Sequence, residues 1–186
     1  MPLVSDGTVP ESPRAATVET MEFIKLVVRD TSRPSWMSPV PPAFGESKTG
    51  TLKADEWRSY STIFLPIALV LLWGDASAHP NPDTAKYFAD NLALTMSLVQ
   101  AITLTCYRMT SNDRADRLQQ HLKTYLTDLR KLYPSEKART NQHVSLHLPA
   151  FLRLYGPVHS WWTYPFERLI GLLQQLPTNN VFGMPY

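Results

Sequence analysis

Two apolar stripes at helical spacing, in neighbouring segments, limit what this chain can fold into. Apolar or small residues recur every three or four positions from about 83 to 109, and again from 113 to 133. This period indicates two helices that each bury one face. The connection at 110–112 is short and holds Ser111, a favourable helix cap, so we expect an antiparallel helical hairpin. The stripes are Phe88, Leu92, Thr95, Val99, Ile102, Cys106 and Met109, then Ala115, Leu118, Leu122, Tyr125, Leu129 and Leu132.

Prolines mark the other helices. Residues 52–73 read as a helix that Pro66 should kink, because proline cannot donate the bond to the preceding turn. After Pro134, residues 135–147 can be helical; Pro149 should then kink or restart the helix, and Gly156-Pro157 should stop it. Val18 to Arg29 fits a short helix or, with its valine pair, a strand.

A last helix should begin near Pro165, since proline suits a first helical position. Its expected buried face is Phe166, Leu169, Ile170, Leu173 and Leu176.

With only seven glycines and few hairpin signals, the chain is predicted to be all-α, a helical hairpin or bundle with an irregular proline-rich arm. We divide it into a mostly disordered segment 1–32, an extended arm 33–51, a helical domain 52–177 and a tail 178–186. Trp36 and Phe44 are the expected anchors of the arm. The most apolar run, 63–73, is far shorter than the roughly 20 residues of a membrane span and should be a buried helix, so no membrane partner is expected.

Positive charge is concentrated in one part of the chain. The whole chain is only +2, but residues 106–143 hold eight Lys or Arg against four acidic residues. A basic helical face can meet phosphates, and the alternative is a solvated amphipathic face. If the segment contacts DNA, the expected residues are Arg114, Arg117, Lys123, Arg130, Lys131 and Arg139.

Two histidines have the spacing of zinc ligands. His143 and His147 are four residues apart and should project from one helix face. Two ligands make half a site, and Cys106, His121 and His159 are conceivable additions that no spacing selects. Cys106, the single cysteine, lies on an apolar stripe and fits a small core residue better than a nucleophile.

Glu167 lies in the first turn of the last predicted helix. A carboxylate there is favoured by the helix dipole and by capping, so a purely structural role is a sufficient explanation. A site with two metal ions needs several converging carboxylates, and no recognisable motif assembles them here.

Three blocks of sequence resemble a known family. His143-Val-Ser-Leu-His147-Leu, Gly156-Pro157-Val158 and Trp162-Thr-Tyr-Pro-Phe-Glu167-Arg168 resemble the C-terminal region of CACTA-type (En/Spm) DNA transposases. Upstream, Arg33-Pro34-Ser35-Trp36 and Gly50-Thr-Leu-Lys-Ala-Asp55-Glu-Trp57-Arg58 look like the fungal members. The similarity spans roughly residues 29–180.

The resemblance implies a ribonuclease-H-like core in which three acidic residues bind two divalent cations such as Mg²⁺. A helical insertion there binds zinc through a Cys-x-x-Cys pair and a His pair, and the third acid follows the second histidine. In this chain Glu167 follows His147 by twenty residues. The resemblance therefore implies that Glu167 is the third catalytic carboxylate and that His143 and His147 are half of the zinc site.

Other parts of that machinery have no counterpart in this sequence. The chain has no Cys-x-x-Cys and no strand-borne aspartate pair, and the sheet on which the last helix would pack is not present. We therefore expect neither the Zn nor the Mg site to be complete, and no transposase activity from this chain. Expected partners are DNA and the missing catalytic core, or a second copy of the chain. The resemblance implies the nucleus, and a single cysteine, which can form no internal disulfide, fits a reducing intracellular compartment. The alternative hypothesis is a non-enzymatic helical module for DNA or protein contacts.

Overall fold

The computed structural model describes residues 15–37, 39–46, 52–75, 79 and 81–175. Within these residues every regular element is helical, so the protein is all-α as predicted. None of the described helices is long and apolar enough to cross a membrane. The elements are α1 (Val18–Asp30), α2 (Ala54–Ser59), a π-helical turn (Tyr60–Phe64), α3 (Leu65–Trp73), α4 (Pro82–Thr105), α5 (Asn112–Leu132), α6 (Thr140–Ser145), α7 (Leu148–Tyr155), a 3-10 turn (Val158–Ser160) and α8 (Tyr164–Gln174).

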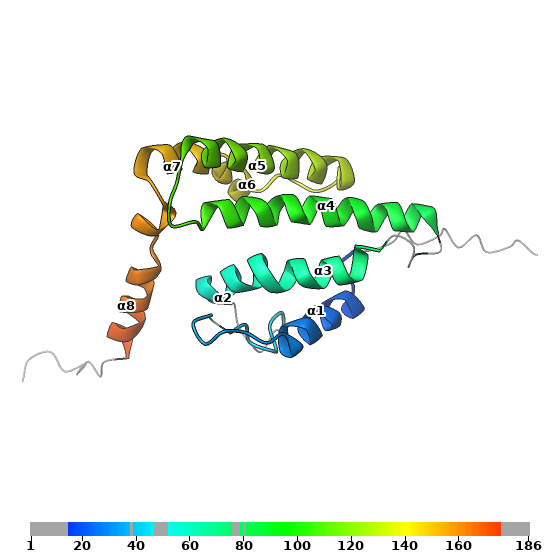
Figure 1. Ribbon diagram of the computed structural model, residues 1–186, viewed down its shortest axis with the longest axis horizontal. Coiled ribbons are helices and arrows are strands. Elements are labelled where there is room, and N and C mark those ends of the chain that lie inside the picture. Colours follow the sequence, from blue (N-terminus) through cyan, green and yellow to red (C-terminus); the bar gives the residue numbers. More distant parts are fainter. Residues whose placement is uncertain (1–14, 38, 47–51, 76–78, 80, 176–186) are drawn as a thin grey trace, which may run out of the picture.

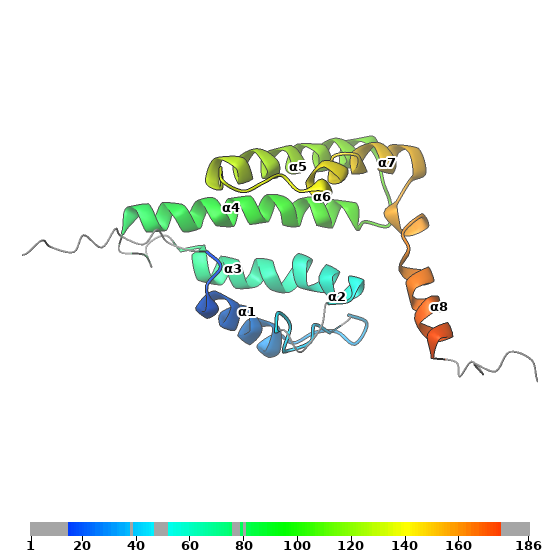
Figure 2. The ribbon, with the colours of Figure 1, turned by 180° about the vertical axis from the view of Figure 1, so that it is seen from behind.

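Helix α4 lies at the centre of the molecule. Figure 1 shows α3 and α1 on one side of it and α5, α6 and α7 on the other, and the reverse view agrees (Figure 2). The predicted hairpin of α4 and α5 is present as two antiparallel neighbours. Both faces of α4 are therefore covered, by different parts of the chain.

One apolar cluster fills the space between α1, α3 and the first half of α4. Phe64 and Ala68 are almost completely buried at its centre. The ring of Trp73 stacks on Phe88 of α4, with centroids 5.5 Å apart. The buried members are Ile24, Val27, Val28, Val40, Phe44, Tyr60, Phe64, Ala68, Leu69 and Trp73, and Phe88, Leu92 and Met96 of α4 pack against them.

A second apolar cluster joins the other half of α4 to α5 and α7. Leu118 of α5 is completely buried, and Leu122 is nearly so. They pack with Ala101 and Leu104 of α4 and with Leu152 of α7. The two halves of α4 pack in different clusters. Polar residues of α4 therefore lie between packed neighbours and need hydrogen-bond partners there.

Hydroxyl groups on α4 are satisfied within the helix. Thr95, Thr103 and Thr105 each donate to the carbonyl four residues earlier, at 2.9, 2.8 and 2.8 Å. A buried polar group without a partner costs free energy, and this back-bonding removes that cost. The arrangement explains how a helix with several threonines can be covered on two sides.

The hairpin connection is longer than predicted. α4 ends at Thr105, not near Met109, and Met109 is 70% exposed. The Cys106 amide bonds to the carbonyls of Ile102 and Thr103, a tightened last turn that ends the helix. Ser111 accepts from the Arg114 amide at 3.2 Å, so the predicted cap of α5 is confirmed.

Pro66 disturbs the helix through the turn before it. The chain from 54 to 73 is helical, but residues Tyr60–Phe64 form a wider π-helical turn in which the Leu65 amide bonds to the Tyr60 carbonyl. Since Pro66 has no amide hydrogen for Thr62, the regular bonding pattern cannot continue there. Inserting the wide turn lets the helix proceed on the far side of the proline.

The N-terminal part of the chain belongs to the packed structure. Of the two alternatives at 18–29 the helix is found, and Ile24, Val27 and Val28 of α1 are buried. The division by sequence placed all of 1–32 in a mostly disordered segment; residues 1–14 of it lie outside the described residues. In the arm, Phe44 is 4% exposed and is an anchor as expected, whereas Trp36 is 80% exposed and is not.

The region between α5 and α7 departs from the helix predicted for 135–147. Only Thr140–Ser145 is α-helical, and residues 133–139 form turns and irregular chain. The reason is topological: the chain leaves α5 at Tyr133 and must turn back before α6 can lie against α5. Gly156 ends α7 with a φ of +78°, which only glycine adopts readily, so the predicted stop is confirmed.

Helix α8 begins with Pro165 in its first turn as predicted, but its apolar face is not buried. It leaves the bundle beyond α7 and extends away from it (Figure 1). The prediction of a buried face was wrong for the residues that are described, because nothing in the described chain covers it; Leu176 lies outside them. The exposed fractions are Phe166 66%, Leu169 52%, Ile170 53%, Leu172 58% and Leu173 53%.

A buried amide organises the junction of α4, α5 and the chain before α1. Asn91 is 4% exposed; its Nδ2 donates to the Tyr87 carbonyl at 2.8 Å and its Oδ1 accepts from the Tyr133 hydroxyl. The Tyr87 hydroxyl lies 3.3 Å from that of Tyr133 and accepts from the Ala15 amide at 3.3 Å. The pKa of Tyr133 is raised to about 12, mainly by burial of the hydroxyl and to a smaller extent by its hydrogen bond to Tyr87.

We expect Tyr133→Phe to lower the free energy of unfolding by about 1–2 kcal/mol, because it leaves the buried Asn91 oxygen without its donor. Urea denaturation at pH 7 measures the change. The control is Tyr125→Phe on α5. Because the Tyr125 hydroxyl has no hydrogen-bond partner among the described residues, the free energy of unfolding should change little. Because folding raises the pKa of Tyr133, its contribution should be lost as the pH rises from 10 to 12. Equal losses in the two variants would contradict the network.

A pair of leucine truncations tests which helices are packed. Leu118→Ala should cost about 2–5 kcal/mol, because it opens a cavity in the second cluster. Leu172→Ala on α8 should cost less than about 0.5 kcal/mol, because the side chain is already in water. Thermal or urea unfolding measures both, and a large loss for Leu172→Ala would show that α8 is covered.

Candidate functional site

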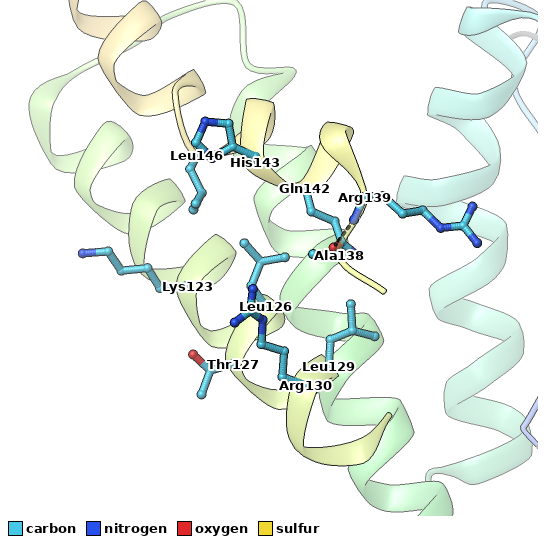
Figure 3. Close-up of a pocket in the computed structure, with 10 residues that line it drawn as sticks. All are labelled: Lys123, Leu126, Thr127, Leu129, Arg130, Ala138, Arg139, Gln142, His143 and Leu146. Atoms are coloured by element: carbon cyan, nitrogen blue, oxygen red, sulfur yellow. Dashed lines mark hydrogen bonds between the residues drawn. The ribbon is translucent and has the colours of Figure 1, made fainter. Parts of the chain in front are cut away.

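A concave site lies between α5 and α6, where the chain returns along α5 after the turn at 133–139. It is a pocket of about 330 Å³, drawn in Figure 3. We call its apolar lining residues, three leucines and an alanine, the floor and its cationic residues the rim; Ala138 and Leu146 of the floor are themselves exposed. The residues that line it are Lys123, Leu126, Thr127, Leu129, Arg130, Ala138, Arg139, Gln142, His143 and Leu146.

Helix geometry explains which basic residues reach this pocket. Lys123 and Arg130 are seven residues apart, two helical turns, so they share one side of α5. Arg139, which precedes α6, and His143 within α6 complete the rim. Thus three of the six cations predicted to contact DNA are brought together.

The other three predicted cations are placed elsewhere. Arg114 lies on the opposite side of α5 from Lys123; its guanidinium sits 4.7 Å over the Tyr107 ring and donates to the Met109 carbonyl. Lys131 pairs with Asp128 at 2.9 Å. Arg117 does not line the pocket. The structure therefore divides a basic segment into a pocket group and residues with other surroundings.

No acidic residue balances the pocket group. Lys123, Arg130 and Arg139 make no ion pair with any residue that the structure describes. Some cations elsewhere are paired, as in Arg153 of α7 with Asp116 of α5 at 2.6 Å. The site therefore has a positive potential that nothing in its lining offsets.

The two histidines lie close together although the predicted single helix does not exist. His143 is in α6 and His147 caps α7, and the helical backbone angles at His147 preserve the spacing of one turn. Their Nε2 atoms are 3.5 Å apart, and both side chains are exposed. Two nitrogens on one tetrahedral zinc ion lie about 3.4 Å apart, so this geometry fits a shared metal ion. It equally fits a hydrogen bond from one ring to the other.

The structure does not complete that pair into a metal site. Among the described residues no three His, Cys, Asp or Glu side chains lie close enough to hold one ion. His159 faces the Cys106 carbonyl instead, with its Nε2 at 2.8 Å. Burial raises the pKa of the Cys106 thiol, which fits a core residue better than a nucleophile or ligand.

Glu167 stands apart from the histidines, in the first turn of α8. Its Oε1 accepts from the Thr163 hydroxyl at 2.9 Å, and the side chain is exposed. This bond joins two side chains across the first turn and caps no backbone amide, so of the two structural roles expected for Glu167 only the position near the positive end of the helix dipole is found. The carboxylate is accessible, and it belongs to no group of three or more His, Cys, Asp or Glu side chains among the described residues that could hold a metal ion.

Sequence reasoning missed the apolar floor of the pocket. Leu126 lies on α5 beside its main stripe and Leu146 follows the end of α6, so only the approach of α6 to α5 brings them to one pocket. The seven-residue spacing of Lys123 and Arg130 was the available signal. That spacing places the two side chains on one face of the helix, which a count of charges alone does not reveal.

The fold and the site together define an all-helical protein with a cationic pocket, an exposed histidine pair and a projecting amphipathic helix. Residues 105–182 match a family described as a domain of unknown function (DUF4218). The matched region begins at the end of α4 and contains the pocket, both histidines and Glu167. No curated protein and no solved structure matches the chain.

Proposed function

We propose that this chain is the C-terminal helical portion of a CACTA-type DNA transposase and is catalytically incomplete by itself. The observation that carries the proposal is the uncovered apolar face of α8, the helix that holds Glu167. In an enzyme of that type this helix would pack on a sheet. A helix with five half-exposed large apolar residues is what remains when such a surface is supplied from elsewhere.

Exposure of this face is costly enough to require a reason. Burying a large apolar side chain stabilises a protein by about 1.5–3 kcal/mol relative to leaving it in water. Phe166, Leu169, Ile170 and Leu173 recur at helical spacing, so a single partner surface would cover them together. We infer that this surface is the missing catalytic core.

The histidine pair supports the same proposal. His143 and His147 would hold a zinc ion together with ligands from outside the described residues, and the ion would fix α6 and α7 against the segment that supplies them. Glu167 would contribute one carboxylate to the cation-binding set, with the other carboxylates also supplied from elsewhere. In such a complex Mg²⁺ would supply activation of the attacking hydroxyl.

The cationic pocket favours a second candidate, a helical module that contacts DNA without catalysing a reaction. Its support is the grouping of Lys123, Arg130 and Arg139 with no acidic residue in the lining. This candidate needs neither Glu167 nor the histidines to act on a substrate. The two candidates therefore differ in the roles of Glu167 and the two histidines. Both candidates contact DNA.

Zinc titration tests the half-site. We expect the purified chain to bind Zn²⁺ weakly and to lose the ion on dialysis, because two imidazoles provide only half of a tetrahedral set. His147→Gln should abolish the weak binding seen by calorimetry. His121→Gln on α5 is the matched control and should retain it. Tight binding that survives dialysis would contradict an incomplete site, and binding unchanged by His147→Gln would contradict the pair as ligands.

A nuclease assay tests incompleteness. With Mg²⁺ or Mn²⁺ the purified chain should not cut duplex DNA above the rate of a Glu167→Gln control, because a single carboxylate cannot position two ions. Metal-dependent cutting that is lost in Glu167→Gln would show that the chain carries a complete site.

A further inference from the structure

The pocket between α5 and α6 combines a cationic rim with an apolar floor, and its shape suggests a particular ligand. We propose that it binds a single strand of nucleic acid, with phosphates on Lys123, Arg130 and Arg139 and with a sugar and base against the floor. This deepens the proposed function and rests on its contact with DNA. It adds which residues make the contact and which form of nucleic acid they prefer.

Charge indicates an anionic ligand. Three permanent cations and His143 stand among ten lining residues that include no carboxylate. Cationic side chains on one surface, with no carboxylate among the lining residues, favour an anionic ligand. Lys131, one residue from Arg130, shows the contrast, because it already has a carboxylate partner in Asp128.

The directions of the side chains indicate a chain of anions instead of one small anion. In Figure 3 the ammonium of Lys123 and the guanidinium of Arg139 extend to opposite sides of the pocket, and the guanidinium of Arg130 lies between them. In this conformation they point apart, so a ligand that contacts all three carries more than one anionic group. Separated cations match the repeated phosphates of a strand, which single-strand binding grooves follow in this way.

The floor indicates an unpaired strand. Leu126 and Leu129 of α5 are partly buried, and together with Ala138 and Leu146, which are exposed, they give the pocket an apolar lining. A pocket of about 330 Å³ is at the small end of ligand sites, and a duplex presents mainly its phosphates and sugars to such a surface. An unstacked nucleotide offers a sugar and base for the leucines, and the His143 ring at the rim can stack on a base.

Fluorescence anisotropy on the full chain tests this assignment. The probes are a labelled single-stranded DNA of mixed sequence, the same sequence as duplex, and a free nucleotide as competitor. We expect at least tenfold tighter binding of the single strand than of the duplex, with affinity falling steeply as salt rises. The free nucleotide should compete poorly, since it offers no repeated phosphates.

Variants at exposed positions locate the site. Lys123→Gln and Arg130→Gln should each weaken single-strand binding about tenfold, and each should reduce the salt slope by about 0.7, the value for one phosphate contact of a single strand. Lys131→Gln and Arg114→Gln, cations of the same helix outside the pocket, are the matched controls and should change affinity less than twofold. Leu126→Gln should weaken binding of the single strand but not of the duplex. Circular dichroism verifies that each variant is folded.

Each other outcome overturns a defined part of the proposal. Duplex bound more tightly than single strand would refute the unpaired strand and leave the proposed DNA contact intact. Effective competition by the free nucleotide would refute the strand as ligand. Equal losses in pocket variants and controls would refute the site. Absence of binding to either DNA at low salt would refute both this inference and the DNA contact, but not the incompleteness that the nuclease assay tests.

Discussion

The packing of α4 between two apolar clusters is the constraint on which the rest of the structure depends. Its first half closes the cluster of α1 and α3 through Phe88 and Leu92, and its second half closes the cluster of α5 and α7 through Ala101 and Leu104. The second cluster fixes α5 and α7, and α6, which connects them, is thereby held beside α5. The pocket and the histidine pair depend on that placement, so their geometry is inherited from the core of α4.

The helices that the sequence predicted well are those whose apolar period and end signals agree. α5 was predicted almost to its ends, because Ser111 caps it and one stripe runs along it. α4 was predicted as a helix with one seam, but its buried residues include Asn91, Leu94 and Ala101, which lie off that seam, because the helix is covered on two sides. A single-stripe analysis cannot show a second covered face. The helix predicted at 135–147 failed for another reason: reversing the chain after α5 required turns where local propensity allowed a helix.

The sequence predicted that the two histidines lie close together, but it did not predict which basic residues group around the pocket. The four-residue spacing of His143 and His147 predicted their proximity, and the Nε2 separation of 3.5 Å confirms it. The run of basic residues was visible, but sequence order does not show that Arg114 stacks on Tyr107 and Lys131 pairs with Asp128. The cations that can contact a ligand are those not already held by neighbouring side chains, and these neighbours are set by the tertiary structure. For α8 the period revealed an apolar face and could not reveal that the described chain leaves it uncovered.

The apolar face of α8, which no residue in the described part of the chain covers, distinguishes this helix from the rest of the bundle. The described helices of the bundle bury both apolar clusters among themselves. In contrast, α8, the helix that holds Glu167, exposes Phe166 and Leu173 to solvent. Amide hydrogen exchange with mass spectrometry tests this claim most directly. Segments of α4 and α5 should exchange only through global unfolding, while residues 164–174 should exchange within seconds, because a solitary helix of eleven residues opens readily. Protection of α8 equal to that of α5 would contradict the account, because it would mean that the chain itself covers this helix.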